Sequence, residues 1–123
     1  MLSLEKLTIS TIARAILLQD SEIVSLVGAK IFPSVAPPDT LSPFVVYERD
    51  AYDTEEVKMG IVREIAVVTY EIVSDDYDIG LEIAVAMHRV LQGDHDGLTF
   101  EIVNSAERYA EGKFRQIIDF KIT

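Results

Sequence analysis

All four prolines of this chain, Pro33, Pro37, Pro38 and Pro43, fall between positions 33 and 43. Proline has no backbone N–H to donate to a sheet, it cannot continue a helix, and it pushes the residue before it into an extended conformation. The stretch from Ile31 to Ser42 is therefore predicted to be an extended arm that pairs with no strand and is partly polyproline-like. Pro43 is expected at the first position of the next strand, where a missing N–H costs least.

The apolar side chains of this arm need to be buried, and two interpretations of how remain open. The arm crosses one edge of the molecule's own sheet, or it packs against a neighbouring subunit. An extended arm that is already ordered loses less conformational entropy on docking than a flexible one. On the second interpretation, the candidate interface residues are Ile31, Phe32, Val35, Pro37, Pro38, Leu41 and Tyr47.

Hydrophobic periodicity predicts the elements on either side of the arm. Helical spacing of apolar residues predicts a first helix over about residues 4–17 and a short second helix that is capped by Ser21 and stopped by Gly28. A third helix is predicted over 74–92, with Ser74 or Asp75 as its N-cap and Gly93 as its stop. Strands are predicted at residues 44–49, 62–73, 98–103 and 113–123.

The predicted order of elements is therefore α-α-β-β-α-β-β. Two hairpins that flank a helix indicate an α+β fold, a mostly antiparallel four-stranded sheet with helices packed on one face. The length of 123 residues fits a single domain, 1–123. The strand at 62–73 is apolar on both faces, which is typical of a middle strand that is covered on both sides or meets a partner.

Charge and cysteine content exclude several functional classes. Acidic residues outnumber basic ones 21 to 11, for a net charge of −10. This balance argues against specific nucleic-acid binding and against anionic membranes, because both need cationic side chains to meet phosphates. The chain has no cysteine, so disulfides and thiol chemistry are excluded and a reducing compartment is expected. Neither a signal peptide nor a membrane-spanning segment is expected.

Residues 50–60 are polar and acidic and are predicted to form a loop or the tip of a long hairpin. They include Asp50, Asp53, Glu55 and Glu56. Such a cluster is either a solvated tip or a surface that contacts a partner or lines a lumen, and the sequence leaves both open.

Few residues suggest chemistry, and each has a simpler structural explanation. Asp94, His95 and Asp96 are of metal-ligating types, but they lie between a helix and a strand, where Asp and Gly form turns. His88 has no nucleophile to activate, because there is no cysteine and no GxSxG motif. The sequence therefore predicts no enzymatic activity, no cofactor and no metal site.

Three short motifs resemble the tail completion proteins (tail terminator, or head–tail joining proteins) of long-tailed bacteriophages and prophages. They are Val27-Gly28-Ala29-Lys30-Ile31-Phe32-Pro33, Ala36-Pro37-Pro38 and Pro43-Phe44-Val45-Val46-Tyr47. The chain departs from the family pattern at Lys30, where arginine is usual, at Pro38, where glutamine is common, and at Gly80, inside the third helix.

The resemblance implies a structural subunit that forms a homo-oligomeric ring, a hexamer, at the head-proximal end of the tail tube. Its partners are then further copies of itself, the tail tube protein and the head connector protein, and DNA passes through the ring. The subunit is expected in the bacterial host cytoplasm during assembly and then in the virion tail. The alternative is a non-catalytic domain, monomeric or dimeric, that binds a small ligand in an apolar pocket between helix 74–92 and the sheet.

Overall fold

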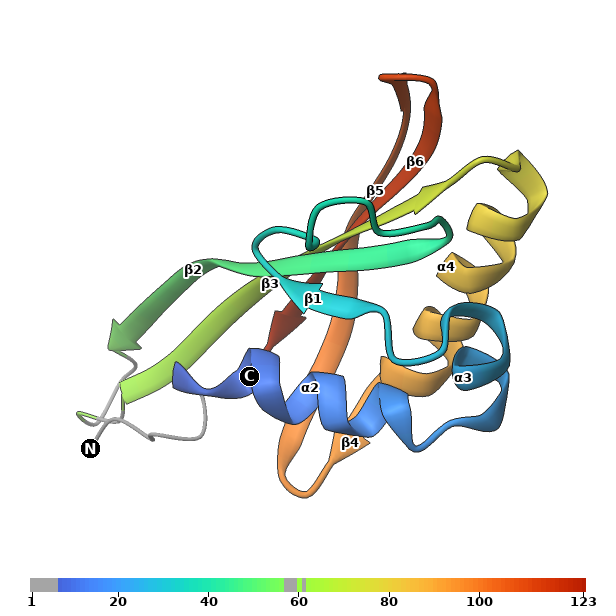
Figure 1. The fold of residues 1–123 in the computed structure, drawn as a ribbon. Coiled ribbons are helices and arrows are strands. Elements are labelled where there is room, and N and C mark those ends of the chain that lie inside the picture. The colour runs from blue at the N-terminus through green and yellow to red at the C-terminus, as the bar shows by residue number, and fades with distance from the viewer. Residues whose placement is uncertain (1–6, 57–59, 61) are drawn as a thin grey trace.

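The computed structural model describes residues 7–56, 60 and 62–123 (Figure 1). The elements in chain order are helix α2 (Ile9–Leu18), helix α3 (Ser21–Val27), strand β1 (Ile31–Pro33), strand β2 (Phe44–Glu56), strand β3 (Val62–Ser74), helix α4 (Tyr77–Leu91), strand β4 (Gly93–His95), strand β5 (Leu98–Ala110) and strand β6 (Lys113–Ile122).

The strands form one six-stranded sheet in the order β1-β2-β3-β6-β5-β4. β1 and β2 are parallel, and the other neighbouring pairs are antiparallel. The predicted fold class, a four-stranded α+β sheet in the order α-α-β-β-α-β-β, is therefore wrong: the chain is mostly β and its sheet is mixed. The two strands that were missed, β1 and β4, have three residues each and are too short to show an alternating pattern.

The prediction that the proline arm pairs with no strand is wrong for Ile31–Pro33. These residues pair with Val45, Val46 and Tyr47 of β2. Ser34 N–H donates to the Tyr47 carbonyl at 2.8 Å. Because amides alternate in direction along a strand, the missing N–H of Pro33 is on the side away from β2, where it costs no ladder bond.

The core lies between one face of the sheet and the helices. Ala66, Val68, Tyr70 and Ile72 of β3 are fully buried on that face, and Ile118, Phe120 and Ile122 of β6 continue it. From α4, Ile83, Met87 and Leu91 pack onto them and are fully buried. The opposite face of β3, from Ile65 to Glu71, stays half-buried, so helices of this subunit cover only one side of the strand.

Both long hairpins extend beyond this core, in different directions (Figure 1). The β2–β3 hairpin is paired as far as Glu56 and Val62, so residues 50–56 are strand. Of the two predicted alternatives, the end of a long hairpin is confirmed and the loop is wrong. The β5–β6 hairpin closes at Ala110 and Lys113. β5 therefore runs seven residues past the predicted end at Val103.

Glycines and caps mark the ends of the helices. Asp20, not Ser21, caps α3 through the amides of Glu22 and Ile23. Asp76, not Ser74 or Asp75, caps α4 by accepting from the Ile79 amide. Gly28 ends α3 with a φ of +63°, as predicted, whereas α4 ends at Leu91 and Gly93 begins β4. Residues 4–6 of the predicted first helix lie outside the described residues.

Gly80, the departure from the family pattern inside the third helix, sits where α4 approaches the end of β3. A side-chain Cβ at this position would lie 3.4 Å from Ser74 Cβ and 3.8 Å from Gln116 Cγ. Both are ordinary van der Waals distances, so a side-chain Cβ would fit here, and the glycine costs helix propensity, about 1 kcal/mol against alanine.

Tyr70 sits at the centre of the core and generates the first prediction. Its ring lies 6.0 Å from the rings of both Tyr47 and Phe120, measured between centroids. Its hydroxyl is buried and has no hydrogen-bond partner within the described part of the chain, and burial raises its pKa far above the usual range. A buried hydroxyl without a partner costs about 1–3 kcal/mol.

We expect Tyr70→Phe to raise the free energy of unfolding by about 1 kcal/mol, because it removes this unpaired hydroxyl and keeps the ring. Urea denaturation at neutral pH measures the change. Tyr47→Phe is the control: among the described residues, only the Tyr70 hydroxyl is buried without a partner, so removing the Tyr47 hydroxyl should bring no such gain. A loss of stability in Tyr70→Phe would mean that the hydroxyl is satisfied by an internal water.

Candidate assembly surface

Residues 34–43, here called the proline loop, leave β1, turn and return to β2. Thr40 closes the turn: its amide and its hydroxyl donate to the Pro37 carbonyl at 3.3 and 2.6 Å. Lys30 Nζ donates to the Leu41 carbonyl at 2.8 Å, and Ser42 Oγ donates to Asp75 at 2.7 Å. The loop is thus held at its turn and at its return to the sheet, although much of it is exposed.

The structure divides the candidate interface residues into two groups. Ile31 and Tyr47 are 1% and 6% exposed and belong to the core of the subunit itself. Phe32 is half-buried. Val35 and Leu41 are 74% and 79% exposed, and both neighbouring prolines are exposed with them. Among these candidates, the apolar side chains that the subunit leaves exposed are therefore on the proline loop, after β1.

A groove of about 430 Å³, here called the loop groove, separates the proline loop from the outer face of the sheet. Val35 and Pro37 line it from the loop, and Phe44, Val46 and Val73 line it from β2 and β3. Three charged residues also line it: Asp39 from the loop, and Glu71 and Arg115, which form an ion pair at 2.5 Å. The groove therefore has walls of mixed polarity and contains a neutralised charge pair.

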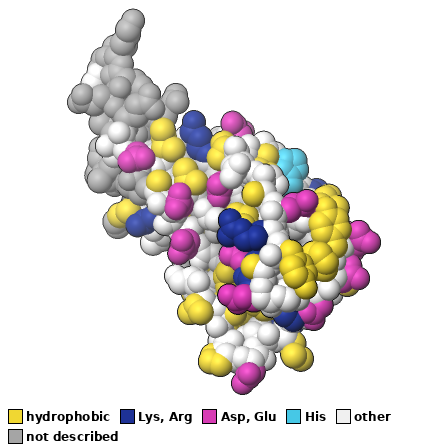
Figure 2. Space-filling model, turned by 90° about the horizontal axis from the view of Figure 1, so that it is seen from above, with side chains coloured by type: hydrophobic (Ala, Val, Ile, Leu, Met, Phe, Trp, Pro, Cys, Tyr) yellow, Lys and Arg dark blue, Asp and Glu magenta, His cyan; other side chains and the backbone are white. Residues whose placement is uncertain are grey.

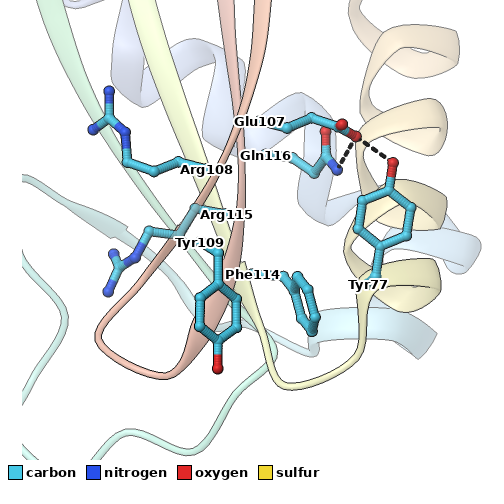
Figure 3. Close-up of a pocket in the computed structure, with 7 residues that line it drawn as sticks. All are labelled: Tyr77, Glu107, Arg108, Tyr109, Phe114, Arg115 and Gln116. Atoms are coloured by element: carbon cyan, nitrogen blue, oxygen red, sulfur yellow. Dashed lines mark hydrogen bonds between the residues drawn. The ribbon is translucent and has the colours of Figure 1, made fainter.

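A second pocket, about 210 Å³, lies between the start of α4 and the β5–β6 hairpin (Figure 3). Phe114 is at its centre, with the ring of Tyr109 at 4.9 Å and that of Tyr77 at 5.8 Å between centroids, both edge-on. Edge-to-face contacts of this kind stabilise aromatic pairs by about 0.5–1.5 kcal/mol. They join the projecting hairpin to α4, although Tyr109 remains 64% exposed.

Polar groups reinforce the same junction. Tyr77 Oη donates to Glu107 Oε2 at 2.5 Å, and Gln116 Nε2 donates to the same oxygen at 2.8 Å. The bond from Tyr77 is the main reason that the pKa of Glu107 lies below its ordinary value near 4.5. The same bond raises the pKa of Tyr77, because the negative charge of Glu107 favours the protonated phenol.

The opposite face of the hairpin is basic. Figure 3 shows Arg108 and Arg115 projecting away from Tyr77 and Glu107, and the two arginines are direct cross-strand neighbours. Arg115 is neutralised by Glu71 at 2.5 Å and by Glu111 at 3.6 Å. Arg108 is exposed and has no ion-pair partner among the residues that the structure describes.

Asp75 connects the proline loop to the hairpin. Its carboxylate accepts from Ser42 on the loop and from Lys113 Nζ on β6. The lysine is the largest cause of its lowered pKa, and the serine hydroxyl adds to it. Two surfaces that are far apart in the sequence are therefore joined at one side chain.

The acidic candidates lie along a strand edge and not on a loop. Asp50 sits at the bulge between Arg49 and Ala51, and Asp53 is exposed three residues later. Glu55 and Glu56 are the last two residues of β2, and their side chains lie outside the described part of the structure. Figure 2 also shows acidic side chains around the hydrophobic patch at the hairpin end of the molecule.

The residues of metal-ligating types make ordinary structural contacts. His95 Nε2 lies 3.0 Å from the Leu91 carbonyl, and its ring packs edge-on against Phe100. Asp94 accepts from Thr99 Oγ1 at 2.6 Å. Over the described ranges, no group of three or more His, Cys, Asp or Glu residues is arranged to hold a metal. None of the described helices is long and apolar enough to cross a membrane.

The sequence analysis missed the hairpin residues Glu107, Arg108, Tyr109 and Phe114. The available signal was Glu111-Gly112, a two-residue turn with φ values of +55° and +75° between Tyr109 and Phe114. Positive φ at both central residues is the type I′ geometry that closes two-residue hairpins.

No protein-family model matches this chain, and no curated protein matches it. Among solved structures, it is similar to a chain of a "Virion of native gene transfer agent (GTA) particle". The match has a TM-score of 0.69 and covers 89% of each chain at 17% identity. The fold is that of a virion chain.

The Tyr77–Glu107 bond predicts a pH dependence of stability. Because the folded pKa of Glu107 is depressed, its contribution is present above its unfolded pKa and is lost as the pH falls through the folded pKa. We therefore expect Glu107→Gln to flatten the decline in stability between about pH 5 and pH 3, as measured by urea denaturation at several pH values.

Tyr77→Phe is the matched variant, because it removes the main cause of the shift and leaves the carboxylate in place. It should flatten the same decline, and the double variant should add little to either single change. Additive effects of the two substitutions would show that the hydroxyl and the carboxylate act independently.

Proposed function

We propose that this chain is a structural virion protein that closes into a homo-oligomeric ring, a hexamer, on the head-proximal end of a phage or prophage tail tube. The ring caps the tube and presents the surface on which the head connector docks. The observation that carries the proposal is the fold shared with a virion chain over 89% of both chains. The three tail-completion motifs in the sequence support the same assignment.

The exposed surfaces support assembly. A closed ring needs a heterologous interface, in which one patch of a subunit meets a different patch of its neighbour. The proline loop offers Val35 and Leu41 on an anchored backbone, and the loop groove lies beside it. An anchored loop of this kind loses little conformational entropy on docking.

The charge supports a conduit for DNA. A ring through which DNA passes works best when it does not bind the phosphate backbone, and affinity for DNA depends on cationic contacts. This chain carries a net charge of −10, and most of its described cations are paired with acids or backbone carbonyls. Arg108 is an exception.

The alternative ligand-binding function has less support. It requires an apolar cavity between α4 and the sheet, but Ile83, Met87 and Leu91 fill that interface and are fully buried. The hollows found at the surface, among them the loop groove and the pocket of Figure 3, lie instead on the outer face and at the hairpin.

Self-association tests the proposal. We expect the purified protein to form an oligomer of one defined size, a hexamer, that grows in population with concentration. Native mass spectrometry and light scattering measure the subunit number. A protein that stays monomeric at every concentration, and that does not bind the ends of purified tail tubes in electron micrographs, would contradict the proposal.

The double variant Val35→Asp/Leu41→Asp tests the proline loop. Because both side chains are exposed in the subunit, we expect the thermal midpoint to be unchanged and the oligomer to dissociate to monomers. Val85→Asp is the control, since Val85 is 62% exposed on α4, away from the loop. Intact oligomers in the double variant, or equal loss in the control, would place the interface elsewhere.

A further inference from the structure

The outer edge of β5 is unpaired over most of its length. β4 pairs only with Leu98–Phe100, and the Gln92 side chain accepts from the Ile102 amide at 3.0 Å. From residue 103 to Ala110, no described strand lies on this edge. Ala110 and Lys113 close the hairpin as a hydrogen-bonded pair, so strand alternation turns the amides of Ser105, Glu107 and Tyr109 outward.

Apart from the exposed charge of Arg108 and a bulge between Ile102 and Asn104, this edge lacks the features that normally prevent strands from pairing with other chains. Natural sheets protect their edges with proline, lysine, outward charges or a covering element. Residues 103–110 contain no proline and no lysine, and the one acid, Glu107, is bonded to Tyr77 and Gln116. Side chains 103–109 are all exposed. The segment is thus a long edge that is open to a further strand.

The free edge of β2 has the opposite character. β1 pairs with β2 only up to Tyr47, so residues 48–56 form a second edge on which no described strand lies. That segment, ERDAYDTEE, has five acidic residues and one arginine. Two such edges repel each other, which excludes a symmetric β2–β2 contact.

The topology allows the two edges to meet. They lie on opposite sides of one sheet, and β2, β3, β6 and β5 alternate in direction. When one copy follows another in the same orientation, its β2 runs antiparallel to the β5 beside it. Contacts of this head-to-tail kind are the ones that generate rings.

Arg108 gives the junction its charge complementarity. It lies directly across from Arg115, and like charges in that position are destabilising. Arg115 has two acidic partners, whereas Arg108 has none within the described part of the chain. An acidic strand along the β5 edge supplies the carboxylates that Arg108 lacks.

We propose that the β5 edge, residues 103–110, accepts the acidic β2 edge, residues 48–56, of a second copy, so that the sheet continues from subunit to subunit. The inference rests on the proposed ring and specifies which edges join its subunits. Main-chain hydrogen bonds supply the affinity and Arg108 selects the acidic strand.

Ser105→Pro tests the edge directly. The outward amide of Ser105 makes no bond within the hairpin, so proline removes a donor from the edge and leaves the β5–β6 ladder intact. We expect self-association to weaken by roughly tenfold or more, as measured by analytical ultracentrifugation. Ser105→Ala, which keeps the amide, should assemble like the wild type, and circular dichroism should show both variants folded.

Cysteine cross-linking tests the partner and does not depend on the proline variant. The native chain has no cysteine, so only introduced residues can form a disulfide. Ala106→Cys protein, which keeps Arg108, is mixed with Asp50→Cys or Asp53→Cys protein and oxidised. We expect a cross-linked dimer in at least one mixture and in no single-variant sample.

The outcomes separate this inference from the proposed function. Defined oligomers that form equally well with Ser105→Pro, and that give no mixed cross-link, overturn the edge pairing and leave the ring standing. Cross-links that form only between two copies of the Ala106→Cys protein mean a symmetric β5–β5 contact and also overturn it. If Ser105→Pro leaves the oligomer intact but abolishes binding to tail tubes, the β5 edge binds another protein and not a second copy, which also overturns the inference. A wild-type protein that never self-associates overturns both proposals.

Discussion

The pairing of β3 on both of its sides is the constraint on which the rest of the structure depends. β3 pairs with β2 from Val62 to Val73 and with β6 from Ala66 to Ser74, so it joins the two long hairpins into one sheet. Its alternate residues, from Ala66 to Ile72, are buried under the helices. Because this strand is fixed by ladders and by the core, both hairpins can extend beyond the core and still keep a defined direction.

Local sequence patterns predicted the elements whose structure depends on one segment of the chain alone, without a pairing partner. The alternation of Ile118, Phe120 and Ile122 identified β6 and its buried face, and Gly28 marked the end of α3. The strand count and fold class were wrong because β1 and β4 are defined by their partners. The prolines argued against a strand at Pro33. β1 has a neighbouring strand on one side only, so it is an edge strand, and proline is tolerated there.

The same limit applies to the candidate surface. The sequence predicted that the proline segment carries apolar residues in need of cover, but it could not separate Ile31, which the subunit buries itself, from Val35 and Leu41, which it leaves exposed. The hairpin residues were missed for a related reason. The stretch ERYAEG is polar, and its continuation as a strand depends on the ladder to β6 and on the contact between Phe114 and Tyr77.

Asp75 has a mechanical consequence for a subunit that must meet neighbours on several sides. Through Ser42 and Lys113, one carboxylate holds both the proline loop and the base of the hairpin next to the start of α4. In the assembly that we propose, a neighbour that displaces the hairpin also acts, through this carboxylate, on the loop.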